Sequence, residues 1–210
     1  MTTQNLQIGS SQDSLFRSIL RGKTRIAMAW LFAALLIFSA RQLPVWPGII
    51  VCFLGATLRF WASGFLRKDN RPAVGGPYAF VRNPLYLGTY LMAIGTALAI
   101  EAWLLVIAVS ILFAIVYHYT ILDEETKLAQ IFGQSYEIYK QSVPRFFPRA
   151  WPPLLPASRA TLLSINPELS HLNFDWKLAL KNKAYEAYVS LIALMGFVAL
   201  LATVWQRFGE

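Results

Sequence analysis

Five apolar runs divide this sequence and restrict it to one kind of fold. They cover roughly residues 26–40, 46–66, 85–100, 102–122 and 188–205. A helix needs about 20 mainly apolar residues to cross a bilayer, with about 17–25 as the usual range, so the first and third runs are short. A buried helix of a soluble protein explains one such run but not five. We therefore expect an all-α integral-membrane helical bundle of about five transmembrane helices.

The charged residues agree with this fold and orient it. Only 14% of the chain is charged, against about 25% in a soluble domain. Sixteen of the 19 Lys and Arg residues precede the first run or lie between the second and third or the fourth and fifth. The positive-inside rule places these segments and the N-terminus in the cytoplasm, and the C-terminus outside. The net charge of +8 then indicates orientation and contact with membrane lipids, not nucleic-acid binding.

The segments outside the runs have recognisable character. Leu15, Phe16 and Ile19 share one face of a short amphipathic helix in residues 1–25, which we expect on the membrane surface. After residue 122 the stretch DEETKLAQIFGQSYEIYKQSV predicts that the fourth helix continues beyond the membrane. The proline-rich PRFFPRAWPPLLP that follows cannot be a regular helix. From Asp175 a basic, aromatic helix is expected to run into the last span.

The chain offers little metal chemistry. Cys52 is the only cysteine, which excludes an intrachain disulfide and a cysteine cluster. The two histidines, His118 and His171, do not have the spacing of a paired zinc ligand set. We expect no metal site.

Residues 75–88, GGPYAFVRNPLYLG, stand at the mouth of an apolar helix. Asparagine is a good N-cap and proline suits the first helical position, so Asn83 and Pro84 predict where the third helix begins. The free N–H groups there and the positive end of the helix dipole form a ready site for an anion such as a carboxylate. Asn83 is either only a cap or a cap that also contacts a ligand.

Two adjacent carboxylates, Glu124 and Glu125, lie at the expected inner end of the fourth span. They are either a solvated charge run or part of a site. Tyr117, Thr120 and Glu124 recur at i, i+3 and i+7 and therefore share a helix face. A carboxylate held on that face needs a cationic or hydrogen-bonding partner.

Three motifs together resemble a known family. GGPYAFVRNPLYLG, then EE about forty residues later, then FGQSYEIYKQSVPRFFP are similar to the integral-membrane methyltransferases, which include isoprenylcysteine carboxyl methyltransferases and phospholipid N-methyltransferases. The resemblance covers about residues 63–148. It implies S-adenosyl-L-methionine as cofactor, in a cytoplasmic pocket formed without a dinucleotide-binding domain. Together with the apolar runs, it leads us to expect that the chain divides into a cytoplasmic amphipathic N-terminus (1–25), a membrane methyltransferase core (26–148), a cytoplasmic loop with an interfacial helix (149–187) and a final transmembrane helix (188–210).

The resemblance also implies site residues. By position, the cofactor-binding residues are Asn70, Arg71, Pro72, Ala73, Tyr78, Asn83, Pro84, Leu85, Tyr86 and Glu124. We expect Arg82 and the start of the helix at Pro84 to hold the cofactor's carboxylate, and Glu124 to accept hydrogen bonds from its hydroxyl or amino groups. Arg82, Glu124 and His118 are our candidate catalytic residues. Anchoring at the membrane interface is the alternative role for Arg82, Tyr78 and Tyr86.

The sequence departs from the family pattern at three positions. Asn83 and Asn70 stand where the family often has histidine, so a mechanism that needs a histidine base there is in doubt. Thr120 stands where the prenylcysteine enzymes have an arginine assigned to the substrate, which puts a carboxylate substrate in doubt. His118 is either a proton acceptor for an amine or thiol substrate or an interfacial polar residue.

These departures favour, as acceptor, an amine or other nucleophile on a lipid-like small molecule over a prenylated protein. Such an amphiphile would enter from the bilayer, past an interfacial belt made of Arg145, Phe146, Phe147, Arg149 and Trp151. Three alternatives remain: a prenylcysteine carboxyl methyltransferase proper, an NADPH-dependent membrane reductase of the sterol type, and a non-enzymatic membrane scaffold. Arg59, inside the second run, either marks a functional site, pairs with Glu101 or reaches the interface.

Overall fold

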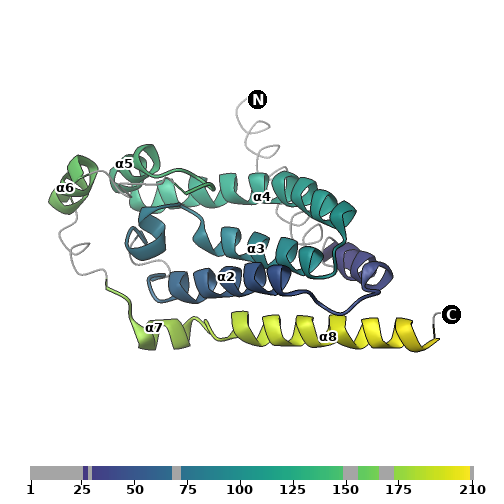
Figure 1. Ribbon diagram of the computed structural model, residues 1–210. Coiled ribbons are helices and arrows are strands. Elements are labelled where there is room, and N and C mark those ends of the chain that lie inside the picture. Colours follow the sequence, from purple (N-terminus) through teal and green to yellow (C-terminus); the bar gives the residue numbers. More distant parts are fainter. Residues whose placement is uncertain (1–25, 28–29, 68–71, 149–155, 166–172, 209–210) are drawn as a thin grey trace, which may run out of the picture.

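A computed structural model describes residues 26–27, 30–67, 72–148, 156–165 and 173–208. Within these residues every regular element is helical (Figure 1). The elements are an apolar helix at Trp30–Ser39, α2 (Trp46–Ser63), the 3-10 helix η1 (Gly76–Ala79), α3 (Pro84–Ala99), α4 (Trp103–Phe132), α5 (Gln134–Ser142), α6 (Pro156–Ile165), α7 (Trp176–Lys181) and α8 (Glu186–Phe208). The expected all-α class is confirmed.

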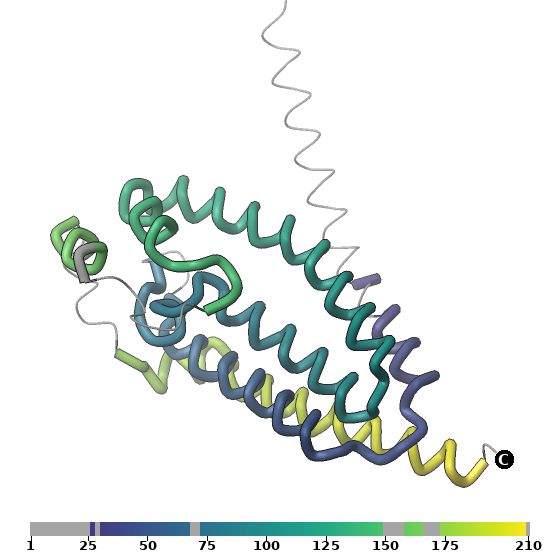
Figure 2. The backbone as a smooth tube through the Cα atoms, turned by 45° about the horizontal axis from the view of Figure 1, so that its top comes forward, coloured from purple at the N-terminus to yellow at the C-terminus, as the bar shows by residue number. Residues whose placement is uncertain are grey.

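The long helices lie side by side in the order α8, α2, α3, α4, as both backbone views show (Figures 1 and 2). Successive members run in opposite directions. One end of the bundle carries the end of α2, the start of α3, the end of α4 and the helices α5 to α7; we call it the loop end. The opposite end carries the turn between α3 and α4, and we call it the turn end.

Three of the described helices, α2, α4 and α8, are long and apolar enough to cross a membrane. Two shorter apolar helices, Trp30–Ser39 and α3, accompany them. These are the first and third runs, which the sequence also marked as short, so about five membrane helices is a fair description. The 30 residues of α4 correspond to about 45 Å, against a hydrocarbon core of about 30 Å. Its last turns therefore extend beyond the span at the loop end.

Glycines set the contact between α2 and α3. A Cβ at Gly48 would lie 2.0 Å from the backbone nitrogen of Ala99, and one at Gly55 would lie 2.6 Å from the carbonyl oxygen of Gly88. A Cβ at Gly95 would lie 2.5 Å from the backbone nitrogen of Cys52. Small residues allow membrane helices to approach backbone to backbone. This close seam fixes α3, whose first residues form part of the site described below.

The turn end holds a compact apolar cluster. Leu36 packs there with residues from α3, α4 and α8. Glu101, in the turn between α3 and α4, has a positive φ of 54° and accepts a hydrogen bond from the side chain of Gln42 at 2.8 Å. Glu101 therefore belongs to the end of the molecule opposite Arg59, and the expected alternative of an ion pair between them is wrong.

Two helices end earlier than expected. Gly133 adopts φ 52° and ψ −129°, a conformation open to glycine, and breaks the helix predicted to run on after residue 122 into α4 and α5. Residues 182–185 separate α7 from α8, with Lys183 at φ 54°. Asp175 caps α7, its carboxylate accepting from the backbone N–H of Leu178 at 3.1 Å. The basic helix expected to enter the last span is therefore two helices.

Candidate active site

A cavity of about 520 Å³ lies at the loop end, between α2, α3, α4 and α5. It is lined by Arg59, Leu66, Arg67, Pro72, Ala73, Tyr78, Arg82, Asn83, Pro84, Leu85, Tyr86, Thr89, Tyr117, Glu124, Leu128, Phe132, Tyr136 and Tyr139. Nine expected site residues are in this set: Arg82, and eight implied by the family resemblance, namely Pro72, Ala73, Tyr78, Asn83, Pro84, Leu85, Tyr86 and Glu124. Segments far apart in the chain thus converge on one space. We call it the large cavity.

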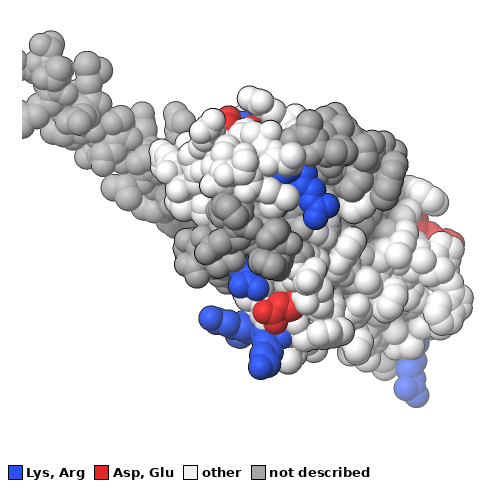
Figure 3. Space-filling view, turned by 90° about the vertical axis from the view of Figure 1, so that its left-hand side faces the viewer, with Lys and Arg blue, Asp and Glu red and all other residues white. Residues whose placement is uncertain are grey.

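The large cavity runs along the bundle. At its inner end, toward the middle of the helices, lie Arg59, Thr89 and Tyr117. Its outer end is formed by residues of the loop after α2 and by α5. Seen from that end, Lys and Arg side chains lie on the surface beside a few carboxylates (Figure 3). A ligand with both charged and apolar parts meets suitable surfaces along this axis.

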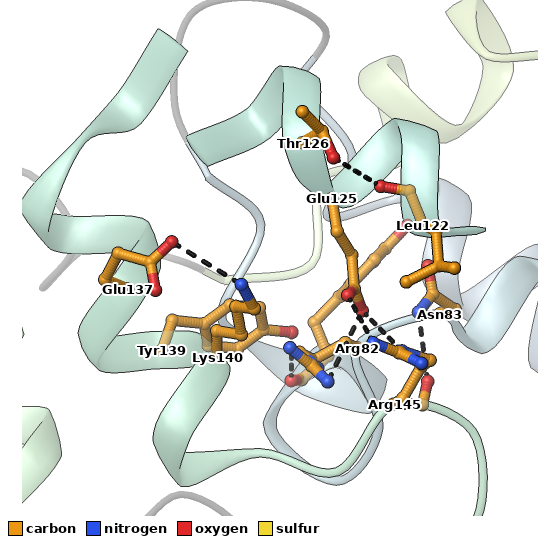
Figure 4. Close-up of polar contacts among 10 residues, drawn as sticks. Arg82, Asn83, Leu122, Glu125, Thr126, Glu137, Tyr139, Lys140 and Arg145 are labelled. Atoms are coloured by element: carbon orange, nitrogen blue, oxygen red, sulfur yellow. Dashed lines mark hydrogen bonds and ion pairs between the residues drawn. The ribbon is translucent and has the colours of Figure 1, made fainter. Parts of the chain in front are cut away.

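A buried carboxylate anchors the site. Glu125 is only 3% exposed, and Arg145 binds it through two nitrogens, Nη2 at 3.0 Å from Oε2 and Nε at 3.2 Å from Oε1. Arg82 approaches from the other side, with Nη2 at 3.4 Å from Oε1. Figure 4 shows the three side chains pointing toward one another from three different segments. This cluster, the Arg82–Glu125–Arg145 bridge, ties α4 to the start of α3 and to the segment after α5.

Asn83 contributes to the same connection. It occupies the N-cap position of α3, with Pro84 in the first turn, but its side chain makes no capping hydrogen bond. Instead its amide Nδ2 donates to the carbonyl of Arg145 at 3.0 Å, and the backbone N–H of Arg82 donates to the carbonyl of Pro144 at 2.9 Å. The predicted start of the helix is right and the predicted side-chain cap is wrong. The side-chain amide of Asn83 therefore binds the segment after α5 and does not cap α3.

The two adjacent glutamates have different environments. Glu124 is exposed to the large cavity, where its Oε2 accepts a hydrogen bond from the hydroxyl of Tyr86 at 2.8 Å. The ring of Tyr86 meets Tyr117 edge to face, with 5.1 Å between centroids. Of the shared face predicted on α4, Tyr117 and Glu124 line the cavity and Thr120 does not. Neighbouring helix positions point about 100° apart, which separates a ligand-facing carboxylate from a structural one.

Two polar side chains of the cavity have buried atoms that the described residues leave without a hydrogen-bond partner. These atoms are the hydroxyl oxygen of Tyr78 and the Nε and Nη1 of Arg82, although the Arg82 side chain is only 8% exposed. Burial, and secondarily the carboxylate of Glu124, raises the pKa of Tyr78 well above its usual range. Its hydroxyl therefore stays protonated and can donate. Unmade hydrogen bonds at buried groups are costly, so these donors are the strongest sign of a polar ligand.

The residues present fit S-adenosylmethionine. The unpartnered N–H groups of Arg82 and the first turn of α3 suit its carboxylate, and Glu124 suits its amino or hydroxyl groups. Tyrosine, phenylalanine and leucine side chains on the walls suit an adenine ring. The volume falls within the roughly 300–1,000 Å³ of small-molecule sites.

A second, more apolar cavity of about 340 Å³ adjoins the first. It is lined by Tyr90, Ser110, Phe113, Ala114, Tyr117, His118, Ile121, Arg145, Phe146 and Phe147. Tyr117 lines both spaces, and its ring stacks on Phe113 with 3.8 Å between centroids. We call this space the aromatic cavity. His118 lies here, exposed, and is absent from the lining of the large cavity.

The expected interfacial belt divides in the structure. Arg145 is held against Glu125, and Phe146 packs on Tyr90 and Phe113 at centroid distances of 5.8 and 5.6 Å. Phe147 is 77% exposed, while Arg149 and Trp151 lie outside the described residues. Arg145 and Phe146 therefore pack against the side of the bundle.

Other expected residues also fall outside the described part of the chain, namely Asn70, Arg71 and His171. Conversely, the sequence analysis assigned no role to several cavity residues: Leu66, Arg67, Thr89, Leu128, Phe132, Tyr136 and Tyr139. Tyr136 and Tyr139 had a usable signal, because they stand three apart on a helix within a motif shared with the methyltransferases. Tyr139 donates its hydroxyl to the carbonyl of Tyr78 at 2.7 Å, which places α5 over the cavity.

Comparison with known proteins adds a family to this geometry. The model of the phospholipid methyltransferase family matches residues 28–135. The chain is 33% identical over 81 residues to protein-S-isoprenylcysteine O-methyltransferase of Schizosaccharomyces pombe, covering 39% of this chain and 34% of that protein. No solved structure matches.

Two bacterial proteins match over a longer stretch. The cobalt-zinc-cadmium resistance protein CzcN of Cupriavidus metallidurans is 30% identical over 137 residues, or 61% of this chain and 63% of that protein. The nickel-cobalt-cadmium resistance protein NccN of Alcaligenes xylosoxydans xylosoxydans is 26% identical over 134 residues, or 63% and 58%. The chain thus spans less than two thirds of the length of each of these relatives. The family match covers more than half of the chain and includes most of the large cavity, and we conclude that the chain belongs to the phospholipid methyltransferase family.

Proposed function

We propose that this protein transfers a methyl group from S-adenosylmethionine, bound in the large cavity, to an amphiphilic acceptor taken from the membrane. One observation carries the proposal: the unpartnered buried donors of Tyr78 and Arg82 face the same cavity as the carboxylate of Glu124. Family membership and the methyltransferase among the relatives support methyl transfer as the chemistry.

Several polar groups of the cavity have a part in holding the cofactor. Arg82 donates an N–H bond from Nε or Nη1 to a carboxylate, and the first turn of α3 adds the positive end of its dipole. Glu124 accepts from an ammonium or from ribose hydroxyls, and Tyr78 donates because its hydroxyl remains protonated. The Arg82–Glu125–Arg145 bridge positions Arg82, since Glu125 occupies only the Nη2 side of its guanidinium.

When bound, S-adenosylmethionine supplies an electrophilic methyl group on its sulfonium sulfur. The protein must then align the acceptor's nucleophile in line with the methyl–sulfur bond and exclude water. Alignment of two bound reactants contributes about 7–11 kcal/mol to such a step. Tyr117 stands where the two cavities meet, so it is suited to orient the acceptor. An amine acceptor also has to lose a proton, and His118, which lines the aromatic cavity, is our candidate to accept it.

The acceptor is proposed to reach the site from the bilayer through the aromatic cavity. Its lining is mainly aromatic and apolar and adjoins the outer face of α4, while the large cavity opens toward the basic loop end. This arrangement suits a molecule with its tail in lipid and its reacting head at the membrane surface. The basic loops further support a cytoplasmic position for the loop end.

The deciding experiment compares ligand stabilisation of the purified protein. A ligand at 100 times its dissociation constant stabilises the fold by about 2.7 kcal/mol, which a thermal-shift assay detects. We expect S-adenosylhomocysteine to raise the melting temperature and NADPH to leave it unchanged. Stabilisation by NADPH alone would overturn the proposal in favour of a reductase, and stabilisation by neither would favour a scaffold. Transfer of label from S-adenosylmethionine to a membrane lipid extract then identifies the acceptor.

A further inference from the structure

Arg59 is a charged residue within a membrane-spanning helix. It lies on α2 and lines the inner end of the large cavity. Its Nη1 donates to the hydroxyl of Thr89 and, at 3.4 Å, to the carbonyl of Leu85, both on α3. Within the described residues no carboxylate forms an ion pair with it. An arginine in a span is costly to place, and such residues usually face a partner or a ligand.

The neutral partners leave most of this guanidinium unused. Arginine offers five N–H donors in a planar fork, and the contacts with the described residues engage only Nη1. A fork of this kind matches a carboxylate or phosphate through two parallel hydrogen bonds. Its strength increases where water is scarce.

Among the arginines that line the large cavity, Arg59 has no carboxylate ion pair within the described residues. Arg82 pairs with Glu125, and Arg67 pairs with Asp175 at 3.7 Å. Glu124 is the cavity's own carboxylate and faces Tyr86. The proposed cofactor carries a sulfonium and an ammonium against one carboxylate, so it brings net positive charge. A second ligand that carries a negative charge would therefore match Arg59.

We propose that Arg59 binds a carboxylate or phosphate of the methyl acceptor, which makes the acceptor an anionic amphiphile. The inference rests on the proposed function and names the substrate class for it. Arg59 shares the inner end of the cavity with Tyr117, whose ring also lines the aromatic cavity. An acceptor with its tail in the aromatic cavity therefore places its head beside Arg59. Thr120 on α4 stands where the prenylcysteine enzymes have an arginine for the substrate, and in this protein Arg59 on α2 provides the cation. This replaces the expected preference for an amine acceptor by an acceptor with an anionic head group.

The test measures binding of single-chain probes to the purified protein in neutral detergent. Dodecyl phosphate and tetradecanoate represent the two anionic heads, and dodecanol is the neutral control. We expect the anions to bind and dodecanol not to bind. Arg59→Gln should weaken anion binding at least tenfold, which is about 1.4 kcal/mol, and Arg59→Lys should retain part of it. The probe that binds more tightly identifies the head group.

Two control variants separate this role from others. Thr89→Val removes a neutral partner of Arg59 and keeps the guanidinium, so anion binding should persist. Arg67→Gln removes an arginine at the outer end of the same cavity, where Asp175 already pairs with it, and should change anion affinity less than twofold. Equal loss in Thr89→Val and Arg59→Gln would overturn the proposal, because Arg59 would then only join α2 to α3.

The affinity for S-adenosylhomocysteine shows whether the anion that Arg59 binds belongs to the acceptor or to the cofactor. We expect it to be unchanged in Arg59→Gln and Arg59→Lys. A tenfold loss in both variants would overturn the proposal, because Arg59 would then hold the cofactor's carboxylate. If the wild-type protein bound the anions through Arg59 but not S-adenosylhomocysteine, the proposed methyl transfer would fail while the anion subsite stood.

Discussion

Helix α3 has two faces that differ in almost every respect. Toward α2 it is closed, because Gly88 and Gly95 leave no room for a single added carbon. Toward α4, at the loop end, the helices enclose a cavity of about 520 Å³ with tyrosines and charged groups on its walls. The closed face depends on the absence of side chains and the open face on a few charged ones. The seam thus holds α3 in position while its other face is free to bind.

Charged groups join the segments around the open face. The Arg82–Glu125–Arg145 bridge connects three of them, with Arg82 and Glu125 buried and Arg145 34% exposed (Figure 4). Replacing one member of a buried ion pair is far more costly than the pair's net contribution, because a buried charge remains unpaired. The two faces should therefore respond to different substitutions.

The largest effect is expected for Glu125→Ala. It leaves Arg82 and Arg145 without their buried counter-ion, and removal of one partner of such a pair costs about 3–5 kcal/mol. Thermal unfolding of the purified protein should show a large fall in melting temperature. Glu124→Ala is the matched control, one residue away and exposed, and should leave the melting temperature almost unchanged. Equal effects of the two would contradict the distinction between a structural and a ligand-facing glutamate.

The next effect tests the closed face. Gly55→Ala introduces a Cβ 2.6 Å from the carbonyl oxygen of Gly88, and overpacking of this kind costs about 1–3 kcal/mol. The control is Gly196→Ala on α8, where nothing lies within 4 Å of the added carbon. That variant should be neutral or slightly stabilised, since alanine favours a helix over glycine. If Gly55→Ala unfolds at the temperature of the wild type, the seam is looser than the structure indicates.

Much of the fold and of the candidate site could be predicted from the amino-acid sequence. Apolar runs located the membrane helices, and Asn83-Pro84 located the start of α3. The family resemblance gave eight expected site residues, and Arg82 was expected beside them; all nine line one cavity. These features are local or carried by the family resemblance, so a single chain reveals them.

What the sequence did not predict depends on contacts between distant segments. Asn83 donates to the carbonyl of Arg145, a partner 62 residues away, so capping preference alone gave the wrong role for its side chain. Glu125 resembles Glu124 in sequence, and only the arrival of Arg82 and Arg145 separates them. The break at Gly133 was missed because a helical pattern continues on both sides of it. Arg59 was recognised as unusual, but its place in the cavity required the packing of α2 against α3.

A smaller effect is expected for the carboxylate that faces the cavity. Glu124→Gln keeps the size of the side chain and removes the charge that we assign to the cofactor. Affinity for S-adenosylhomocysteine, measured by titration, should fall about tenfold, or about 1.4 kcal/mol, with the melting temperature of the ligand-free protein unchanged. Tyr86→Phe removes only the hydroxyl that donates to Glu124 and should reduce the affinity less. An unchanged affinity in Glu124→Gln would mean that the cofactor's polar groups bind elsewhere.

The smallest effect is expected at Asn83, the residue directly before α3. If the Asn83 side chain capped the helix, Asn83→Asp would be neutral, because aspartate caps as well as asparagine. In the structure its amide donates to the carbonyl of Arg145 at 3.0 Å, and an aspartate carboxylate cannot donate. Asn83→Asp and Asn83→Ala should then both lose one hydrogen bond, about 0.5–1.5 kcal/mol. Unfolding measurements separate the two roles: a neutral Asn83→Asp beside a destabilised Asn83→Ala restores the cap. Comparable losses in both variants would mean that Asn83, like the Arg82–Glu125–Arg145 bridge, holds the segment after α5 beside the open face.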